Sequence, residues 1–300
     1  MSIDLSATLP RRLHKRIAER LGIPLQDASL LWEGGRVRVI TPESDEPRLL
    51  SLETLVFEED TVLLDGVALG EAPPLAYALL NKPKNVTSTT RDPRDKTNLA
   101  PYLQAMPPGC FPVGRLDRET TGILLCTNDG DLASAVLRPD HLTTKTYWLW
   151  LDEVVEDDDP RLARFVSGVP HNGQLLLAKS ARILARSEHS TELELVLTQG
   201  RKRQIRLMCR VLGLHLQHLH RNRIGPLTDH GLELGAWRLL APTEVDDLWQ
   251  AAGGRAEVHQ RKVNAFIHHA TELRAAGTPH VRLERWLAIH ALYPLQFDSE

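Results

Sequence analysis

A stretch near the middle of the chain, residues 111–130, constrains the fold and its chemistry more than any other. Residues 123–126 form an uninterrupted apolar run, which is typical of a short buried strand, and the polar residues after it predict a turn. Before this strand, a turn-prone segment carries one carboxylate, Asp117, between Arg115 and Arg118. The pattern predicts an aspartate on a loop anchored by a rigid strand, where proteins often hold reactive groups. A surface aspartate that merely pairs with an arginine is the alternative.

The composition is that of an ordinary soluble globular protein, with 42% hydrophobic and 25% charged residues. A length of 300 residues predicts two domains, or one domain with appendages. No apolar run approaches the roughly 18 residues that span a bilayer, and the first residues lack the pattern of a signal peptide. The three cysteines are widely spaced and form no C-x-x-C pair, which argues against a disulfide framework and a zinc site. We therefore expect a cytoplasmic protein without a membrane segment.

Charges are segregated along the chain, although the net charge is only −3. Such a net charge by itself argues mildly against nucleic-acid binding. Residues 201–223, however, contain no acidic residue. The basic residues of this segment are Arg201, Lys202, Arg203, Arg206, Arg210, Arg221 and Arg223. A second basic cluster lies in residues 11–20, whereas acids gather in residues 156–159. This segregation predicts a surface that faces phosphate groups.

The first 70 residues predict a small unit of two helices and a few strands. Apolar residues recur every four positions over residues 11–21, which indicates an amphipathic helix. The other elements expected here are a helix over 27–32, strands over 36–40 and 61–67, and a proline-rich linker over 71–74.

The rest of the chain intersperses strands and helices. Strands are predicted over residues 75–80, 123–126, 143–151, 175–177, 181–184, 191–197 and 214–224. Helices are predicted over residues 98–104, 129–137, 161–166, 199–210 and 242–249. A glycine pair at 253–254 predicts a hinge, and helical character follows over 263–273 and 282–292.

The helix predicted over residues 199–210 has two distinct faces. Its apolar face consists of Ile205, Met208 and Leu212. Its basic face consists of Arg203, Arg206 and Arg210. A basic helix that only faces solvent is the alternative. The next strand carries three histidines, His215, His218 and His220, but they lack the cysteine or acidic neighbours of a zinc site.

Four motifs that follow one another in the chain resemble those of the RsuA-type pseudouridine synthases. They are residues 114–130 around Asp117, the Lys145-x-Tyr147 pair, residues 199–210, and residues 237–249 with Leu240. Residues 81–83, Asn-Lys-Pro, also resemble the entry turn of this family's catalytic domain. The resemblance extends over residues 75–249. Residues 11–70 resemble the S4 RNA-binding domain that often precedes the catalytic domain in this family.

The resemblance implies an α+β fold, with a small S4-like domain and a catalytic domain whose mixed, mainly antiparallel sheet carries flanking helices. We expect the S4-like domain in residues 1–70, the catalytic domain in residues 71–250, and a helical C-terminal extension in residues 251–300. Within the family, residues 168–170 and 199–209 are most similar to the large-subunit synthase F subgroup. Lys202 and Leu207 depart from the usual Asn and Arg, so the RNA contact from that helix is expected to differ.

The family isomerises a uridine of structured RNA to pseudouridine, by breaking the N-glycosidic bond and rejoining the base through C5. This chemistry needs no cofactor and no metal. The resemblance implies that Asp117 is the catalytic aspartate, that Arg206 keeps it ionised against the effect of burial, and that Tyr147 stacks on the base. It further implies that Leu240 walls the pocket and that Arg115 replaces the flipped-out uridine. The remaining implied RNA contacts are Lys145, Arg201, Lys202, Arg203, Arg210, Arg221 and Arg223.

Ribosomal RNA of the large subunit is the favoured partner, transfer RNA is the second choice, and a monomer is the default state. Two other functions stay open from the residues alone. One is a non-catalytic RNA-binding or ribosome-assembly protein, against which the intact Asp117, Tyr147 and Arg206 argue. The other is a glycoside or nucleoside hydrolase, which usually needs a second carboxylate. Glu119 is near Asp117 in sequence, but the family gives it no role.

Overall fold

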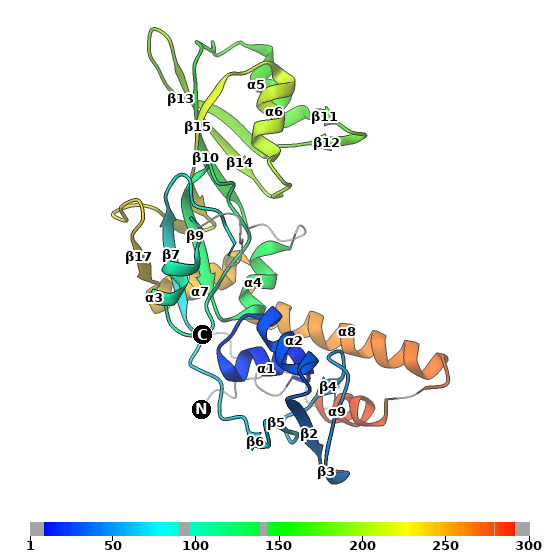
Figure 1. The fold of residues 1–300 in the computed structure, drawn as a ribbon. Helices are drawn as coiled ribbons and strands as arrows, with labels where there is room; N and C mark the ends of the chain where they lie inside the picture. The colour runs from blue at the N-terminus through cyan, green and yellow to red at the C-terminus, as the bar shows by residue number, and fades with distance from the viewer. Residues whose placement is uncertain (1–8, 90–96, 139–142, 279, 292–300) are drawn as a thin grey trace. The chain divides into compact units, whose positions relative to one another are not determined.

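The computed structural model describes residues 9–89, 97–138, 143–278 and 280–291 (Figure 1). The chain divides into two compact units. One unit is Pro10–Ala252, and the described part of the other comprises Leu9 and residues 253–278 and 280–291. No helix in the described residues is long and apolar enough to cross a membrane.

The first part of the larger unit is a small two-helix, few-strand region, as predicted. Its helices are α1 (Leu13–Leu21) and α2 (Leu25–Glu33), and Leu13 and Ile17 of α1 are buried. They enclose a core with Val37, Val39 and Val62 of a small antiparallel sheet. That sheet has the order β3-β2-β5-β6 (Ser44–Arg48, Val37–Thr41, Thr61–Leu64, Val67–Ala68), and β1 (Arg11–Arg12) pairs separately with β4 (Leu55–Val56). β3 was not predicted from the sequence, because its residues are polar and include a proline. An edge strand such as β3 tolerates both.

A large mixed sheet forms the body of this unit. Among its described strands the pairings are antiparallel except for β9 with β15, so the predicted mixed, mainly antiparallel sheet is confirmed. The order is β13 (Ser180–Arg186), β14 (Thr191–Leu197), β10 (Lys145–Leu151), β15 (Leu216–Ile224), β9 (Thr121–Thr127), β7 (Tyr77–Lys82) and β17 (Trp237–Leu239). The short strands β16 (Leu227–Thr228) and β8 (Phe111–Pro112) extend it, and β11 (Val169–His171) pairs with β12 (Gln174–Leu176).

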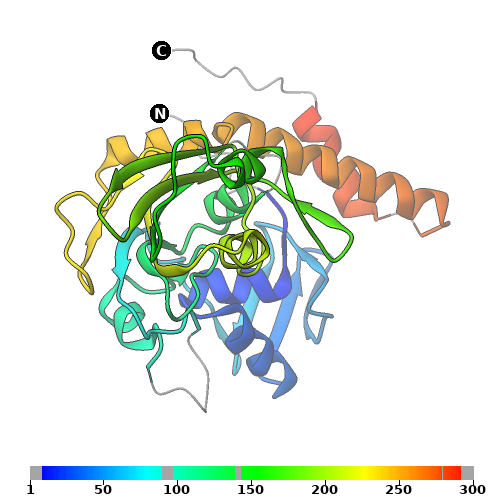
Figure 2. The ribbon, with the colours of Figure 1, turned by 90° about the horizontal axis from the view of Figure 1, so that it is seen from above.

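Helices pack beside this sheet, and α6 is the one that matters most for the site. Met208 and Ile205 of α6 and Phe165 of α5 share a buried core with alternate leucines of β14. Figure 2, in which α6 is seen end-on, shows the strands curving over it. The helices of this part are α3 (Ala100–Ala105), α4 (Gly130–Leu137), α5 (Pro160–Ser167), α6 (Gln204–Leu212) and α7 (Pro242–Ala251).

The start of α6 differs from the prediction. The helix was expected to begin near residue 199, but it begins at Gln204, and Arg203 before it has a left-handed backbone with φ 56°. Gln204 explains the boundary, because its buried amide accepts from Arg201 N and donates to Leu177 O. Residues 199–203 are thereby held as a loop rather than as a first helical turn.

The second unit contains the helices α8 (Arg255–Ala275) and α9 (Val281–Ala291), so the two predicted C-terminal helices are confirmed. α8 starts earlier than residue 263, directly after the glycine pair. Phe266 and Trp286 join the helices edge to face at 5.8 Å, and Arg274 binds Glu284 at 2.8 Å. Contacts between α8 and α9 therefore stabilise this pair of helices.

β9 and β15 approach each other unusually closely where they run parallel. Gly122 has φ 111°, and a Cβ there would lie 2.2 Å from the carbonyl oxygen and 2.6 Å from the nitrogen of Arg221. Real Cβ atoms are not found so close to backbone, so only glycine permits this crossing. The crossing lies five residues beyond Asp117 in the chain and therefore fixes the end of the Asp117 loop.

We predict that Gly122→Ala destabilises the fold by about 3 kcal/mol or more, because backbone must separate and the positive φ becomes strained. Gly130→Ala is the matched control, since a Cβ at Gly130 meets nothing within 4 Å and the residue opens α4. Its effect is expected to stay below about 1 kcal/mol. Urea unfolding of both variants measures the difference, and equal stability of the two would contradict the close approach.

Candidate active site

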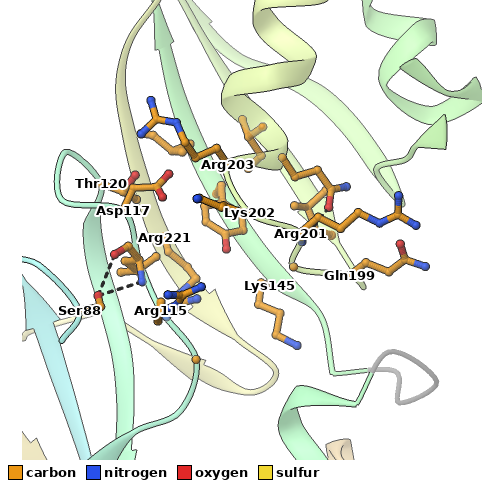
Figure 3. Close-up of a pocket in the computed structure, with 18 of the residues that line it drawn as sticks. Ser88, Arg115, Asp117, Thr120, Lys145, Gln199, Arg201, Lys202, Arg203 and Arg221 are labelled. Carbon is orange, nitrogen blue, oxygen red and sulfur yellow. Dashed lines mark hydrogen bonds between the residues drawn. The ribbon is translucent and has the colours of Figure 1, made fainter. Parts of the chain in front are cut away.

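Asp117 lies in a pocket with a cavity volume of about 740 Å³. The pocket is formed by the loop before β9, the starts of β10 and α6, the end of β15, and the 87–89 segment. Of the predicted site residues it is lined by Arg115, Asp117, Lys145, Tyr147, Arg201, Lys202, Arg203, Arg206 and Arg221 (Figure 3). Tertiary structure thus gathers residues from three of the four sequence motifs around one carboxylate.

Hydrogen bonds hold the Asp117 loop in place on both sides. Ser88 Oγ donates to Leu116 O at 2.8 Å and accepts from Leu116 N at 3.0 Å (Figure 3). Thr120 N donates to Asp117 O at 3.0 Å, which closes a turn over the aspartate. No sequence pattern pointed to Ser88, because it lies 28 positions before Leu116 and only the fold brings the two together.

Arg206 of α6 is the cation nearest to Asp117 in the pocket. Its Nε lies 3.7 Å from Asp117 Oδ2, its Nη1 lies 3.4 Å from Glu119 Oε2, and its Nη2 donates to Thr120 Oγ1 at 3.2 Å. The Arg206 side chain is 13% exposed, whereas those of Asp117 and Glu119 are 28% and 56% exposed. Arg206 is therefore held in place by the Asp117 loop itself, with one nitrogen directed at each of three residues.

A β-bulge determines which side chains of β10 and β15 enter the pocket. Lys145 is paired with Ile224, but Tyr147 is paired with Arg221, so β15 has one extra residue, Asn222, between these pairs. Side chains alternate along a regular strand, and the bulge lets Arg221 and Ile224 face the same side. Both line the pocket together with Tyr147.

Two buried lysines lie under the pocket. The Lys82 ammonium donates to Pro83 O and Val86 O, and the Lys145 ammonium donates to Val136 O and Thr143 O. Burial lowers the pKa of Lys82 to about 8, an effect that Asp117 opposes and Arg221 reinforces. Burial and Arg221 likewise lower the pKa of Lys145 to about 8. Lys82 is a cation near Asp117 that the sequence reasoning missed, although it sits in the Asn-Lys-Pro turn.

Arg221 completes this buried cationic group. It is 5% exposed, and its Nε donates to Ile123 O at 2.8 Å. Arg221 and Lys145 both line the pocket, and their RNA contacts stay predictions.

Three predicted residues lie outside this pocket. Leu240 follows β17 and donates its backbone N–H to Tyr77 O, and it is not among the residues that line this pocket, whereas Ile224 is. Arg223 is exposed and turned away, because it precedes Ile224 beyond the bulge. Arg210 lies in a neighbouring hollow of about 350 Å³, together with Arg203, Arg206 and His215. The predicted grouping of the three arginines is confirmed, although Arg203 precedes the helix.

The rim of the pocket is basic. Arg201, Lys202 and Arg203 are exposed on the loop before α6, and Figure 3 shows Arg201 and Lys202 across the cavity from Asp117. Arg115 is exposed beside Asp117. No group of three or more His, Cys, Asp and Glu in the described residues forms a metal site, and the cysteines are free thiols. One carboxylate within a cationic cavity defines an enzyme site suited to a polyanionic substrate.

Comparison with known proteins identifies the family. Residues 76–210 match the family of RNA pseudouridylate synthases. The chain is 32% identical over 235 residues to ribosomal small subunit pseudouridine synthase A of Escherichia coli, covering 78% of this chain and 98% of the relative. It is 28% identical over 256 residues to the dual-specificity RNA pseudouridine synthase RluF of Salmonella typhi, covering 85% and 84%.

A solved structure supports the same conclusion. A crystal structure of a pseudouridylate synthase aligns with a TM-score of 0.53 at 26% identity, covering 79% of this chain and 99% of that chain. The chain belongs to the RsuA-type family of RNA pseudouridine synthases, which are isomerases. Its α+β fold and its synthase activity, predicted from the motifs, are thereby confirmed, and the non-catalytic alternative is not supported.

The buried lysines predict a pH dependence of stability. The pKa of Lys82 is about 8 in the folded protein and 10.5 as its ordinary value. Between these pH values the unfolded chain binds more protons, so the free energy of unfolding rises with pH, by at most about 1.4 kcal/mol per pH unit. Lys82→Met lacks this contribution. As the pH rises from about 8 to 10.5, the free energy of unfolding of the wild type should therefore increase relative to that of Lys82→Met.

Urea unfolding at several pH values between 7 and 10.5 measures that difference. The exposed Lys84→Met is the matched control and should leave it constant. Lys145→Met provides a second test if Lys82→Met does not fold, because the pKa of Lys145 is also about 8. A pH-independent difference for both buried lysines would contradict their lowered pKa values.

Proposed function

We propose that the chain converts a uridine of ribosomal RNA to pseudouridine, with Asp117 as the catalytic group. The observation that carries the proposal is the placement of Asp117 beside Arg206 in a pocket with Tyr147 and Ile224. One relative supports the choice of ribosomal RNA, since synthase A is named for the small ribosomal subunit. Large-subunit RNA, which the sequence favoured, remains part of the proposal.

Asp117 acts at the sugar or base of the bound uridine, either as nucleophile or as proton acceptor. Both roles need an ionised carboxylate. Arg206 at 3.7 Å and the nearby Lys82 supply positive charge that favours the ionised form. The N1–C1′ bond of uridine breaks, the base turns, and a C5–C1′ bond forms with release of the proton from C5. Tyr147 and Ile224 line the wall against which the base turns.

The exposed cations around the pocket bind the phosphates of the RNA. Arg201, Lys202 and Arg203 form one rim, Arg115 lies on the opposite side, and Arg210 extends the basic surface into the neighbouring hollow. Flipping the uridine into the pocket leaves a gap that Arg115 fills. The region of α1 and α2 adds RNA affinity as an S4-like domain, and the protein acts as a cytoplasmic monomer.

A hydrolase with two carboxylates is less well supported. Glu119 contacts Arg206, but it does not line the pocket and is 56% exposed. A hydrolase of this kind places both carboxylates at the bond that is broken.

We predict that Asp117→Asn and Asp117→Ala lower tritium release from 5-[³H]uridine-labelled ribosomal RNA at least about 10³-fold, because both remove the reacting carboxylate. Glu119→Gln is the matched control, since it removes the other acid at Arg206, and should keep the rate within about threefold. Filter binding of the same RNA should change little in either Asp117 variant.

Each result has a definite meaning. Full release by Asp117→Asn would refute the role of Asp117. If the wild type releases tritium from transfer RNA but not from ribosomal RNA, transfer RNA is the substrate, and the role of Asp117 is unaffected. If Glu119→Gln lowers tritium release as much as Asp117→Asn does, the reaction requires two carboxylates.

A further inference from the structure

A chain of hydrogen bonds links four side chains outside the pocket. Thr121 Oγ1 lies 2.7 Å from His220 Nδ1 and 3.0 Å from His218 Nε2. His220 Nε2 lies 2.6 Å from Asp229 Oδ2. The first three residues stand on neighbouring strands, since His220 is in parallel register with Thr121. We call this chain of four residues, His218–Thr121–His220–Asp229, the histidine relay.

With a neutral His220, the donors and acceptors of the relay have one consistent direction. Asp229 accepts from His220 Nε2–H, which leaves Nδ1 of a neutral His220 as an acceptor. Thr121 then donates its hydroxyl proton to His220 Nδ1 and accepts from His218 Nε2–H. Burial, together with His220, Lys84 and Arg206, lowers the pKa of His218 and keeps it neutral. Every polar atom that the relay joins has a partner in this arrangement.

Aromatic side chains of β10 hold the two imidazoles in place. Trp150 packs against His218 with ring centroids 5.0 Å apart, and Trp148 packs against His220 at 6.1 Å. Thr121 is 3% exposed, and the His220 side chain is 12% exposed. The rings therefore cannot turn away to solvent without losing this packing.

The relay is covalently adjacent to the Asp117 loop. Thr121 follows Thr120, whose N–H donates to Asp117 O and whose Oγ1 accepts from Arg206 Nη2. Neighbouring residues of a strand point to opposite faces, so Thr120 faces the pocket while Thr121 faces the relay. Gly122, which follows, is pressed against Arg221. The peptide between Thr120 and Thr121 is thus fixed from both faces of the sheet.

We propose that the histidine relay positions the Asp117 loop for catalysis, with Thr121, His220 and Asp229 as positioning residues that act through Thr120 on Arg206 and Asp117. This inference rests on the catalytic role proposed for Asp117. None of the relay residues lines the pocket. The relay therefore affects the reaction rate and leaves RNA affinity unchanged.

Protonation of His220 reverses one bond of the relay. Protonated His220 carries N–H at both ring nitrogens, so Nδ1 no longer accepts from Thr121. The charged groups that act on the two histidines are Asp229, Lys84 and Arg206. Trp148 and Trp150, which pack on the rings from β10, carry no titratable group. The bond between Thr121 and His220 Nδ1 therefore has opposite directions in the neutral and the protonated form of His220.

The test compares Thr121→Val, which keeps the shape and removes the hydroxyl, with Thr121→Ser, which keeps the hydroxyl. Single-turnover tritium release from 5-[³H]uridine-labelled ribosomal RNA, with saturating enzyme, should fall about 10- to 100-fold in Thr121→Val and His220→Asn. Thr121→Ser should retain the wild-type rate within about threefold, as should His230→Gln, a control at an exposed histidine beside Asp229. The dissociation constant for the same RNA, from filter binding, should stay the same in all four variants.

The pH profile separates positioning from a general loss of structure. The pH–rate profile of His220→Asn should differ in shape from that of the wild type, whereas that of His230→Gln should not. Nitrogen-15 spectra of the wild-type imidazoles should show His220 as the Nε2–H tautomer at neutral pH, which tests the relay without any variant. Release by Thr121→Val equal to that of the wild type, or a His220 that is protonated on Nδ1 at neutral pH, would overturn the relay.

The outcomes also separate this inference from the proposed function. An inactive Asp117→Asn together with a fully active Thr121→Val would overturn the relay and leave the catalytic aspartate intact. A fully active Asp117→Asn would overturn the catalytic role of Asp117 and with it the relay.

Discussion

The close parallel crossing of β9 and β15 is the constraint on which the site depends. Gly122 lets the backbone of Arg221 approach to a distance that no other residue permits. Because β9 carries the Asp117 loop and β15 carries the wall of the pocket, this single contact sets their separation. Thr120, just before the crossing, accepts a hydrogen bond from Arg206 of α6. A loop, a helix and a strand from distant parts of the chain are thereby joined at one point of the sheet.

Electrostatics of the pocket follow from that geometry. Lys82, Lys145 and Arg221 are buried around a cavity whose acid is Asp117, and backbone carbonyls rather than carboxylates bind the two lysines. Burying cations without acidic partners is costly, as the lowered pKa values of both lysines show. The resulting positive potential favours a polyanionic substrate. The fold therefore maintains at some cost the environment that the proposed reaction needs.

Much of the site could be predicted because its signals are local. The apolar run of β9 and the polar loop before it are adjacent in sequence, so Asp117 was expected on a loop anchored by a strand. The periodic arginines near α6 likewise indicated a basic surface. Lys82 and Ser88 were missed because their partners are backbone atoms, which no residue pattern reveals. The wall position of Leu240 was implied by a resemblance alone, and the pocket is lined by Ile224, which no local pattern indicated.

The sequence by itself determined the family, the loop that carries Asp117, and the order of most helices and strands, because periodicity and motifs depend on neighbours in the chain. The tertiary structure alone decided which side chains face the pocket. The bulge at Asn222 turns Ile224 inward and Arg223 outward, and strict alternation along β15 would have given the opposite result. It also joined Thr121, His220 and Asp229 in one hydrogen-bonded relay. Such contacts depend on strand register, which the whole sheet sets and no single strand encodes.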